Sequence, residues 1–579
     1  MRTVYGRAME SDLEIARRAE LRPITNVAES IGIESDDLQL HGPSIAKVTW
    51  SRLREVDESR RGKLILVTSV NPTPFGEGKT VTTIGLNQGL NRIGKRACCV
   101  IREPSMGPVF GIKGGAAGGG NSQVLPMEEI NLHFTGDLHA VSMAHNLLSA
   151  MLDNHLNKGN TLNIDLESVF WPRVMDMNDR SLRSITIGQG AKVNGPVRTD
   201  RFDITAASEV MAILALSKNY ADLRMRLGSI IVAADDEGGP VTADDLEAGG
   251  AMALLLRTAF LPNLVQTLEG DPAFIHCGPF ANIAHGNSSV IADSIALSTC
   301  DYVVTEAGFG ADMGAEKALQ IKAAASGVVP DCIVLNVTVR SMKLHGGAFG
   351  NKGSRRPSKE EIAREDVEAV KAGATSNLAR HLSNLSRTGL PVVVSINRFR
   401  TDTDAELDIL RDVATNSGAE SVVLFEGHAK GGVGAKDLAE AVASAADSHV
   451  KSGRPYEPVV SEGDNARSRI SKVGLELYGA SSITISDQAE AALAEIESWG
   501  FGDLPVCMAK TQYSFSHKSD MLGSPSDFDL PIREIRLNAG AGFIVAVCGS
   551  MMTMPGLPTR PGAAGMDIDE NGELFGVFG

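Results

Sequence analysis

A glycine-rich turn that ends in a Gly-Lys-Thr triplet is the part of this sequence best suited to chemistry. Gly76 and Gly78 let backbone amides approach an anion closely, because neither residue carries a Cβ. The Lys79 ammonium group can reach the β- and γ-phosphates of a nucleotide, and the Thr80 hydroxyl can contact Mg²⁺. The standard loop begins with glycine, whereas this chain has Thr73. The turn is predicted to bind a nucleotide, and an ordinary glycine-rich turn is the alternative.

The segments on either side are those that a phosphate loop requires. Residues 64–70 are almost continuously apolar, as expected for a strand that is covered on both faces. Apolar residues then recur at helical spacing until Gly94, so a helix starts near Lys79 and points its positive dipole end at the same anion. Residues 97–101 complete a β-α-β unit. The predicted nucleotide-binding residues are Thr73, Pro74, Phe75, Gly76, Glu77, Gly78, Lys79 and Thr80, of which Thr80 also contacts Mg²⁺.

Apolar strand-like runs alternate with helical patterns along the rest of the chain. This alternation predicts an α/β fold with a mostly parallel, doubly wound sheet of the P-loop NTPase type. We expect a nucleotide-binding domain at residues 1–350, a second α/β (Rossmann-like) domain at 351–455 and a smaller C-terminal α/β domain at 456–579. The boundaries are suggested by polar segments with proline at 349–359 and 453–465.

Polar and charged residues follow several of the apolar runs. Arg102 and Glu103 come after the second strand, and Phe309 lies just beyond the run at residues 302–305. Ligands in open α/β sheets bind beyond the carboxyl ends of the strands, so a large active site along one sheet edge is predicted. The glycine-rich segment 113–120 is predicted to approach a substrate or phosphate closely, and a flexible linker is the alternative.

One stretch of the chain contains histidine and aspartate residues that are candidate metal ligands. Its candidate ligands are His133, Asp137, His139 and His145. Their spacing fits no recognised zinc ligand set, and Mg²⁺ carried by a nucleotide needs few protein ligands. Three roles remain open for Asp137: contact with that Mg²⁺, orientation of a substrate amine, or capping of the segment around Leu138.

Composition excludes several other classes of protein. The 579 residues are 43% hydrophobic and carry a net charge of −16, which argues against a general nucleic-acid binder. No apolar run approaches the roughly 20 residues that a membrane span requires, and the N-terminus lacks the apolar core of a secretion signal. Seven scattered cysteines are typical of reduced thiols rather than of a disulfide framework, so we expect a cytoplasmic protein.

Taken together, the motifs resemble those of the formate–tetrahydrofolate ligase family, also called 10-formyltetrahydrofolate synthetase. Two of the matching blocks read Thr73-Pro-Phe-Gly-Glu-Gly-Lys-Thr80 and Arg102-Glu-Pro-Ser-Met-Gly-Pro-Val-Phe-Gly111. The others are residues 113–120, 131–137, 278–286, 305–312, 508–515 and 552–558. The resemblance therefore covers essentially the whole chain.

The resemblance implies that ATP phosphorylates formate and that N10 of tetrahydrofolate then attacks the formyl carbon of the resulting formyl phosphate. Phosphoryl transfer needs positioning and charge neutralisation, and a guanidinium fork suits an oxyanion. The implied catalytic residues are Lys79, Arg102 and Asp137. A homotetramer and activation by a monovalent cation such as K⁺ or NH₄⁺ are implied in the same way. The glycine-rich loop would exclude water from the mixed anhydride.

The resemblance is weaker where the folate ring would bind. The family typically has Asn-Arg-Phe-Pro and Trp-Ala-Lys-Gly-Gly after two strands, whereas this chain has Arg400 for the proline and His428 for the tryptophan. Phe399 keeps one stacking face, and loss of the tryptophan should remove about 1–3 kcal/mol of stacking. His428 can still stack, and Arg400 can lie flat on a ring or meet a glutamate tail. The implied substrate or folate residues are Glu103, Phe309, Phe399, Arg400 and His428.

These departures leave three hypotheses for function. The first is a formate–tetrahydrofolate ligase with a modified pterin slot. The second is a related ATP-dependent acyl-phosphate ligase that uses another acid or a non-standard acceptor. The third, from another class, is an ATP-switched partner-binding protein, although such switches usually have a much smaller chain.

Overall fold

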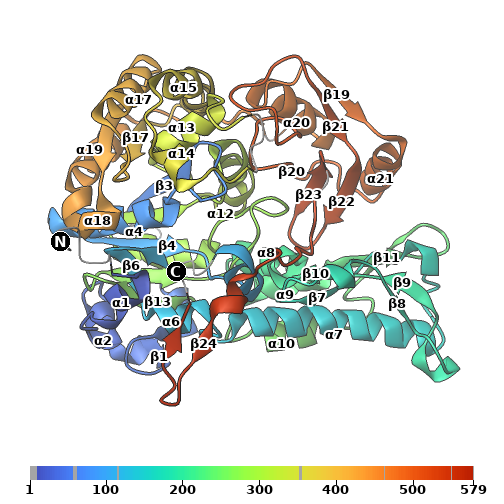
Figure 1. Ribbon diagram of the computed structural model, residues 1–579. Coiled ribbons are helices and arrows are strands. Elements are labelled where there is room, and N and C mark those ends of the chain that lie inside the picture. Colours follow the sequence, from blue (N-terminus) through green and yellow to red (C-terminus); the bar gives the residue numbers. More distant parts are fainter. Residues whose placement is uncertain are drawn as a thin grey trace.

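The computed structural model describes residues 10–56, 61–113, 117–350, 355–461, 463–549 and 551–577. Its central element is a twelve-stranded sheet with the main order β1-β2-β13-β14-β4-β15-β3-β16-β17-β18 (Figure 1), and β5 and β6 extend it beside β13. Every neighbouring pair from β14 to β18 is parallel, so the predicted mostly parallel sheet is confirmed. The strands are β1 (Leu38–Leu40), β2 (Ala46–Val48), β3 (Lys63–Ser69), β4 (Ala97–Ile101), β5 (Gly118–Gly119), β6 (Ser122–Leu125), β13 (Asn263–Thr267), β14 (Pro272–Ile275), β15 (Tyr302–Glu306), β16 (Cys332–Val337), β17 (Val392–Asn397) and β18 (Ser421–Phe425).

Helices cover both faces of this sheet, as a doubly wound fold requires. In β3, Ile65 and Val67 pack with side chains of α4 and α19, whereas Leu66 packs with those of α16. Successive strand residues point to opposite faces, so both faces of β3 are buried. The main covering helices are α4 (Lys79–Arg92), α11 (Val290–Thr299), α13 (Val339–His345), α15 (Val367–Gly373), α16 (Ala379–Ser386), α17 (Asp404–Asn416) and α19 (Lys436–Ser452). Shorter helices are α1 (Asp12–Arg17), α2 (Ile24–Glu29), α3 (Trp50–Arg54), α5 (Met106–Pro108), α6 (Met127–Asn131), α12 (Ala323–Ser326), α14 (Lys359–Ala363) and α18 (Gly427–Lys430).

The strands expected in a second domain extend the central sheet. β17 and β18 lie within residues 351–455, and β17 pairs in parallel with β16. The division into three domains stays a prediction, but these strands do not form a sheet of their own. Residues after 456 do form separate sheets around their own hydrophobic cluster. Their elements are α20 (Ala466–Lys472), β19 (Ser482–Ile485), α21 (Asp487–Ser498), β20 (Val506–Ala509), β21 (Asp529–Ile532), β22 (Glu534–Asn538) and β23 (Phe543–Val547).

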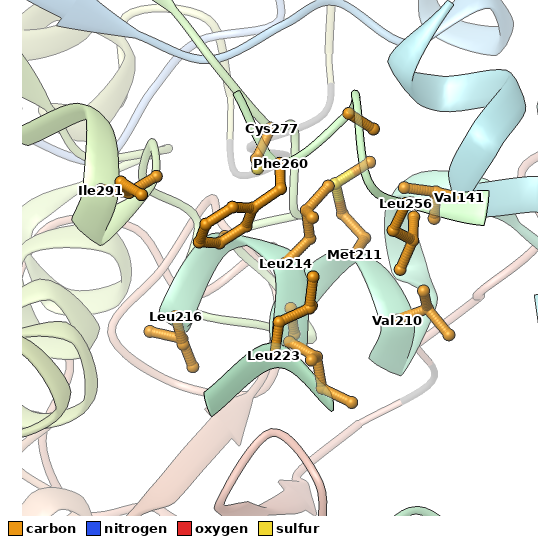
Figure 2. Close-up of a cluster of buried hydrophobic side chains, with 14 of the residues drawn as sticks. Val141, Val210, Met211, Leu214, Leu216, Leu223, Leu256, Phe260, Cys277 and Ile291 are labelled. Carbon is orange, nitrogen blue, oxygen red and sulfur yellow. The ribbon is translucent and has the colours of Figure 1, made fainter. Parts of the chain in front are cut away.

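A helical layer lies along one side of the sheet and includes α7, the long helix at the bottom of Figure 1. Figure 2 shows Val141 of α7, Met211 and Leu214 of α8, Phe260 and Cys277 in one buried cluster. This packing fixes α7 relative to the segment that follows β14. The helices are α7 (Asp137–Asn157), α8 (Glu209–Leu216), α9 (Tyr220–Gly228) and α10 (Gly249–Leu255). In the described part of the chain, no helix combines the length and the apolar character that a bilayer crossing would need.

The remaining strands form two-stranded pairs outside the central sheet. The apolar segment at residues 231–234 is one example, because β11 pairs in antiparallel fashion with β12. These strands are β7 (Arg173–Met175) with β10 (Phe202–Ile204), β8 (Ile185–Ile187) with β9 (Arg198–Asp200), β11 (Ile231–Ala234) with β12 (Pro240–Thr242), and β24 (Asp567–Ile568) with β25 (Leu574–Phe575).

Candidate active site

The predicted phosphate loop connects β3 to α4, in the strand–loop–helix order that the sequence indicates. Gly76 has φ 75° and Gly78, the residue before the first turn of α4, has φ 70°. This left-handed backbone strongly favours glycine, and a Cβ on Gly78 would lie 2.5 Å from the Asn397 amide nitrogen. The Gly76 amide donates to the Thr73 carbonyl at 3.1 Å, so it supports the turn itself.

Glu77 holds the loop from the inside. Its buried carboxylate accepts from the Thr73 amide at 2.7 Å and from the Thr338 hydroxyl. The Glu77 carbonyl accepts from the Asn397 side chain at 3.1 Å, and the Gly76 carbonyl accepts from the Arg340 guanidinium. Glu77, which was predicted to contact the nucleotide, therefore uses its side chain to shape the loop.

Five charged or polar side chains lie at the carboxyl ends of β3, β4 and β15. The Lys79 ammonium lies 3.4 Å from the Ser69 hydroxyl, and the Thr80 hydroxyl donates to Glu306 at 2.8 Å. Arg102 Nη2 lies 4.0 Å from the other Glu306 oxygen. β15 lies between β4 and β3 in the parallel sheet, so all three strand ends share one edge.

Arg102 retains the capacity to bind an anion. Its Nη1 donates to the Pro279 carbonyl at 3.2 Å, while Nε is buried and has no hydrogen-bond partner in the described structure. Its side chain is 26% exposed. Burial lowers the pKa of Arg102, and the nearby Glu306 carboxylate opposes that shift. The positive charge of this partly exposed side chain would attract an incoming anion.

The oxygen atoms of Thr80 and Glu306 fit the needs of a nucleotide-bound Mg²⁺. Mg²⁺ in such sites takes one or two protein oxygens and completes its shell with water and phosphate. No group of three or more His, Cys, Asp or Glu side chains that could hold a metal occurs among the described residues. His145, one of the candidate ligands from the sequence, is a core residue that lies 2.8 Å from the Ser208 hydroxyl and stacks on Trp171.

Asp137 lies in a buried charge cluster next to this edge. Its carboxylate accepts from the Lys47 ammonium at 2.8 Å and from the Asn263 side chain at 2.9 Å. The Lys47 side chain is 0% exposed and that of Asp137 is 4% exposed. Gly136 is the N-terminal cap residue of α7 and Asp137 is the first residue of the helix, so Asp137 does not occupy the cap position.

Glu103 and His276 surround the same ion pair. Burial, and next the Asp137 carboxylate, raise the pKa of Glu103 well above its usual range, while Lys47 opposes the shift. One Glu103 carboxylate oxygen is buried and has no partner among the described residues. Burial and then Lys47 lower the pKa of His276 to about 4, so its imidazole is neutral at pH 7. Burial therefore disfavours the charged form of Glu103, and a neutral His276 imidazole lies near the Lys47–Asp137 pair.

The residues predicted for the folate slot do not form a single aromatic sandwich. The Arg340 guanidinium carbon lies 4.1 Å from the centroid of the Phe399 ring. Arg400 and His428 are exposed, and Phe309 has the unusual φ of 58°. No stacked pair among the described aromatic rings joins Phe399 to His428.

The glycine-rich loop is described only in part, because residues 114–116 lie outside the described residues. Its last glycines approach the protein closely. A Cβ on Gly120 would lie 2.1 Å from the His428 carbonyl oxygen and 2.8 Å from the His428 ring, and the Gly120 amide donates to Asp12 at 2.8 Å. The C-terminal end of the loop, at Gly120, therefore packs against His428 of the predicted folate slot. The role of the loop as a lid stays a prediction.

The phosphate loop and the polar strand ends around it define a nucleotide-dependent α/β enzyme. Residues 10–578 match the family described as formate–tetrahydrofolate ligase. Formate–tetrahydrofolate ligases from Symbiobacterium thermophilum and Roseiflexus castenholzii are each 52% identical to this chain, over 574 and 569 residues, and cover 98% of it and 100% of the relative. The relative from Methylobacterium nodulans is 50% identical over 572 residues, with the same coverage. The chain therefore belongs to the formate–tetrahydrofolate ligase family.

Sequence reasoning did not assign roles to three residues of this site. Glu306 and Arg340 follow apolar strands, so their position at the sheet edge carried a signal, but nothing indicated their partners. Lys47 stands in the apolar segment Ile45-Ala46-Lys47-Val48, where a lysine is unusual unless it is paired. Each becomes recognisable only when its distant partner is placed beside it.

Proposed function

We propose that this site catalyses the formate–tetrahydrofolate ligase reaction. ATP would phosphorylate formate to formyl phosphate, and N10 of tetrahydrofolate would take the formyl group to give 10-formyltetrahydrofolate, ADP and phosphate. The comparisons support this function, and nothing in them supports a different acyl-phosphate ligase or an ATP-switched partner-binding protein.

Lys79 and Arg102 neutralise the charge that develops during phosphoryl transfer. Lys79 leaves the first turn of α4 beside Ser69, where it can reach a bound phosphate chain. Thr80 and Glu306 would hold Mg²⁺, which would supply positive charge to the phosphate chain of the nucleotide when bound. Arg102 lies across Glu306 from Thr80 and would hold formate and then formyl phosphate through its guanidinium group.

Asp137 acts on the acceptor side through its position next to Glu103. Lys47 keeps the Asp137 carboxylate in a fixed, paired position at the start of α7. Phe399, Phe309 and His428 would contribute apolar and stacking surface to the pterin ring, and Arg400 would meet the glutamate tail. The exposed positions of Arg400 and His428 support contacts at the outer rim of the slot.

The single observation that carries this proposal is that Thr80 of the phosphate loop and Arg102, directly after β4, both lie beside the Glu306 carboxylate. This shared contact supports a site in which the nucleotide and the acid bind beside the same carboxylate. The test is incubation with Mg-ATP, formate and tetrahydrofolate, followed by acid conversion of the product to the methenyl form and absorbance. Absence of product at saturating tetrahydrofolate, with ATP turnover on another acid, would contradict the proposal.

We further propose a cytoplasmic homotetramer that a monovalent cation such as K⁺ or NH₄⁺ activates. All seven cysteines are free and buried, which supports a reducing compartment. Sedimentation velocity measures the assembly, and replacing K⁺ by Na⁺ at constant ionic strength measures the cation effect. A monomer in solution, or equal rates in both salts, would contradict the respective part.

A further inference from the structure

Arg340 contacts both halves of the candidate site. It lies in the first turn of α13, directly beyond β16. Its Nη2 donates to the Gly76 carbonyl of the phosphate loop, and its guanidinium carbon lies 4.1 Å from the centroid of the Phe399 ring. Its Nε is buried without a partner in the described structure. One side chain therefore bridges the nucleotide loop and the ring predicted to stack on folate.

The elements on either side of Arg340 hold the same stretch of the loop. Thr338, the N-terminal cap of α13, donates to the Glu77 carboxylate. Asn397, at the end of β17 and two residues before Phe399, donates to the Glu77 carbonyl at 3.1 Å. The Phe399 amide in turn donates to Asp402 at 2.7 Å, which closes the turn after β17. A displacement of the loop at Gly76 or Glu77 would therefore change the position of Phe399 through the contacts of Arg340 and Asn397.

We propose that Arg340 is a positioning residue that makes tetrahydrofolate binding depend on occupancy of the phosphate loop. This inference rests on the proposed function, because it takes residues 76–80 as the nucleotide site and Phe399 as a stacking surface. The guanidinium lies over one face of the Phe399 ring, and the flat pterin ring would stack on the opposite face. When a nucleotide orders the loop, the Gly76 carbonyl holds the guanidinium, and the guanidinium holds the ring at the angle that the acceptor needs.

The size of the expected effect follows from the contact that transmits it. A cation–π contact at a partly exposed site contributes enough to change an equilibrium constant by on the order of 3- to 30-fold. Coupling between two ligands is reciprocal, so the nucleotide should tighten tetrahydrofolate binding by the same factor by which tetrahydrofolate tightens nucleotide binding. The coupling factor should therefore be the same whichever ligand is added first.

The experiment measures the Kd of tetrahydrofolate by fluorescence titration with and without saturating MgADP. In the wild type, MgADP should lower this Kd by about 3- to 30-fold. In Arg340→Met, the ratio of the Kd without MgADP to the Kd with MgADP should lie within about twofold of one. Arg340→Lys keeps a charged donor but not the planar group, so its ratio should lie between those of the wild type and Arg340→Met. A wild-type ratio of one, or a wild-type ratio retained in Arg340→Met, would overturn the inference.

A second readout separates positioning from general damage to the fold. At saturating MgATP, Arg340→Met should raise the KM for tetrahydrofolate while kcat stays within about twofold, since the reacting groups are not removed. Arg411→Met, which removes an exposed arginine paired with Asp408 on α17, is the matched control and should keep the wild-type ratio. Loss of coupling in that control would also overturn the inference. A wild-type enzyme that forms 10-formyltetrahydrofolate but shows no coupling refutes this inference alone, whereas one that forms no product refutes the proposed function.

Discussion

Replacement of Lys47 by methionine tests the buried ion pair beneath the candidate site. The Lys47 ammonium donates to Asp137 at 2.8 Å and to the Leu261 carbonyl at 2.8 Å, and its side chain is fully buried. Methionine has similar length but no charge, so the Asp137 carboxylate would remain buried with only the Asn263 amide as a partner. We expect Lys47→Met to lower the free energy of unfolding by about 3–5 kcal/mol, the usual cost of breaking a buried pair on one side.

A double-mutant cycle shows whether the pairing is the cause. Asp137→Asn keeps the shape of the side chain but leaves the Lys47 ammonium unpaired, so it should be similarly costly. The double variant removes both charges and should cost less than the sum of the single changes by about 2–3 kcal/mol. Urea unfolding followed by tryptophan fluorescence measures all four proteins. A loss below about 1 kcal/mol in Lys47→Met, or strict additivity in the double variant, would refute the reasoning.

Four further predictions concern single residues. Lys79→Ala should lower the rate of ATP cleavage by at least about 100-fold without changing the urea midpoint, and a wild-type rate would show that the phosphate-loop assignment is wrong. Glu306→Gln should raise the Mg²⁺ concentration needed for half-maximal MgADP binding by on the order of tenfold, and an unchanged titration would remove Glu306 from the metal site. Gly120→Ala should raise the KM for tetrahydrofolate by on the order of tenfold, because its Cβ would lie 2.1 Å from the His428 carbonyl oxygen, and an unchanged KM would separate the loop tip from the acceptor slot. Burial raises the pKa of Glu209 from its ordinary value of 4.5 to about 8, so the folded state holds a proton that the unfolded state loses, and stability falls as the pH rises from about 4.5 to 8. Glu209→Gln should abolish this loss of stability, which is on the order of 4 kcal/mol at pH 8.5. Urea unfolding of the wild type and the variant at pH 5 and pH 8.5 measures the loss, and the same pH dependence in both proteins would contradict the prediction.

The amino-acid sequence by itself determined the local architecture of the nucleotide half. The apolar run of β3, the two left-handed glycines and the helix that begins at Lys79 all follow from patterns within one short segment. Such patterns are readable because apolar periodicity and the backbone freedom of glycine act between near neighbours. The parallel sheet and the family membership were also predictable, since alternating strands and helices and the motif blocks are written along the chain.

The tertiary structure alone decided which distant groups become partners. Lys47 meets Asp137 across 90 residues of chain, and Thr80 meets Glu306 across 226. The position of β17 beside β16 in the central sheet has the same origin. A strand's sequence shows that it must be covered and paired, but it does not specify its neighbour, because that choice depends on how all the elements pack together. The chemistry of this site depends on those neighbours, so its ion pair, its acidic residue on β15 and its Arg340 bridge become visible only in three dimensions.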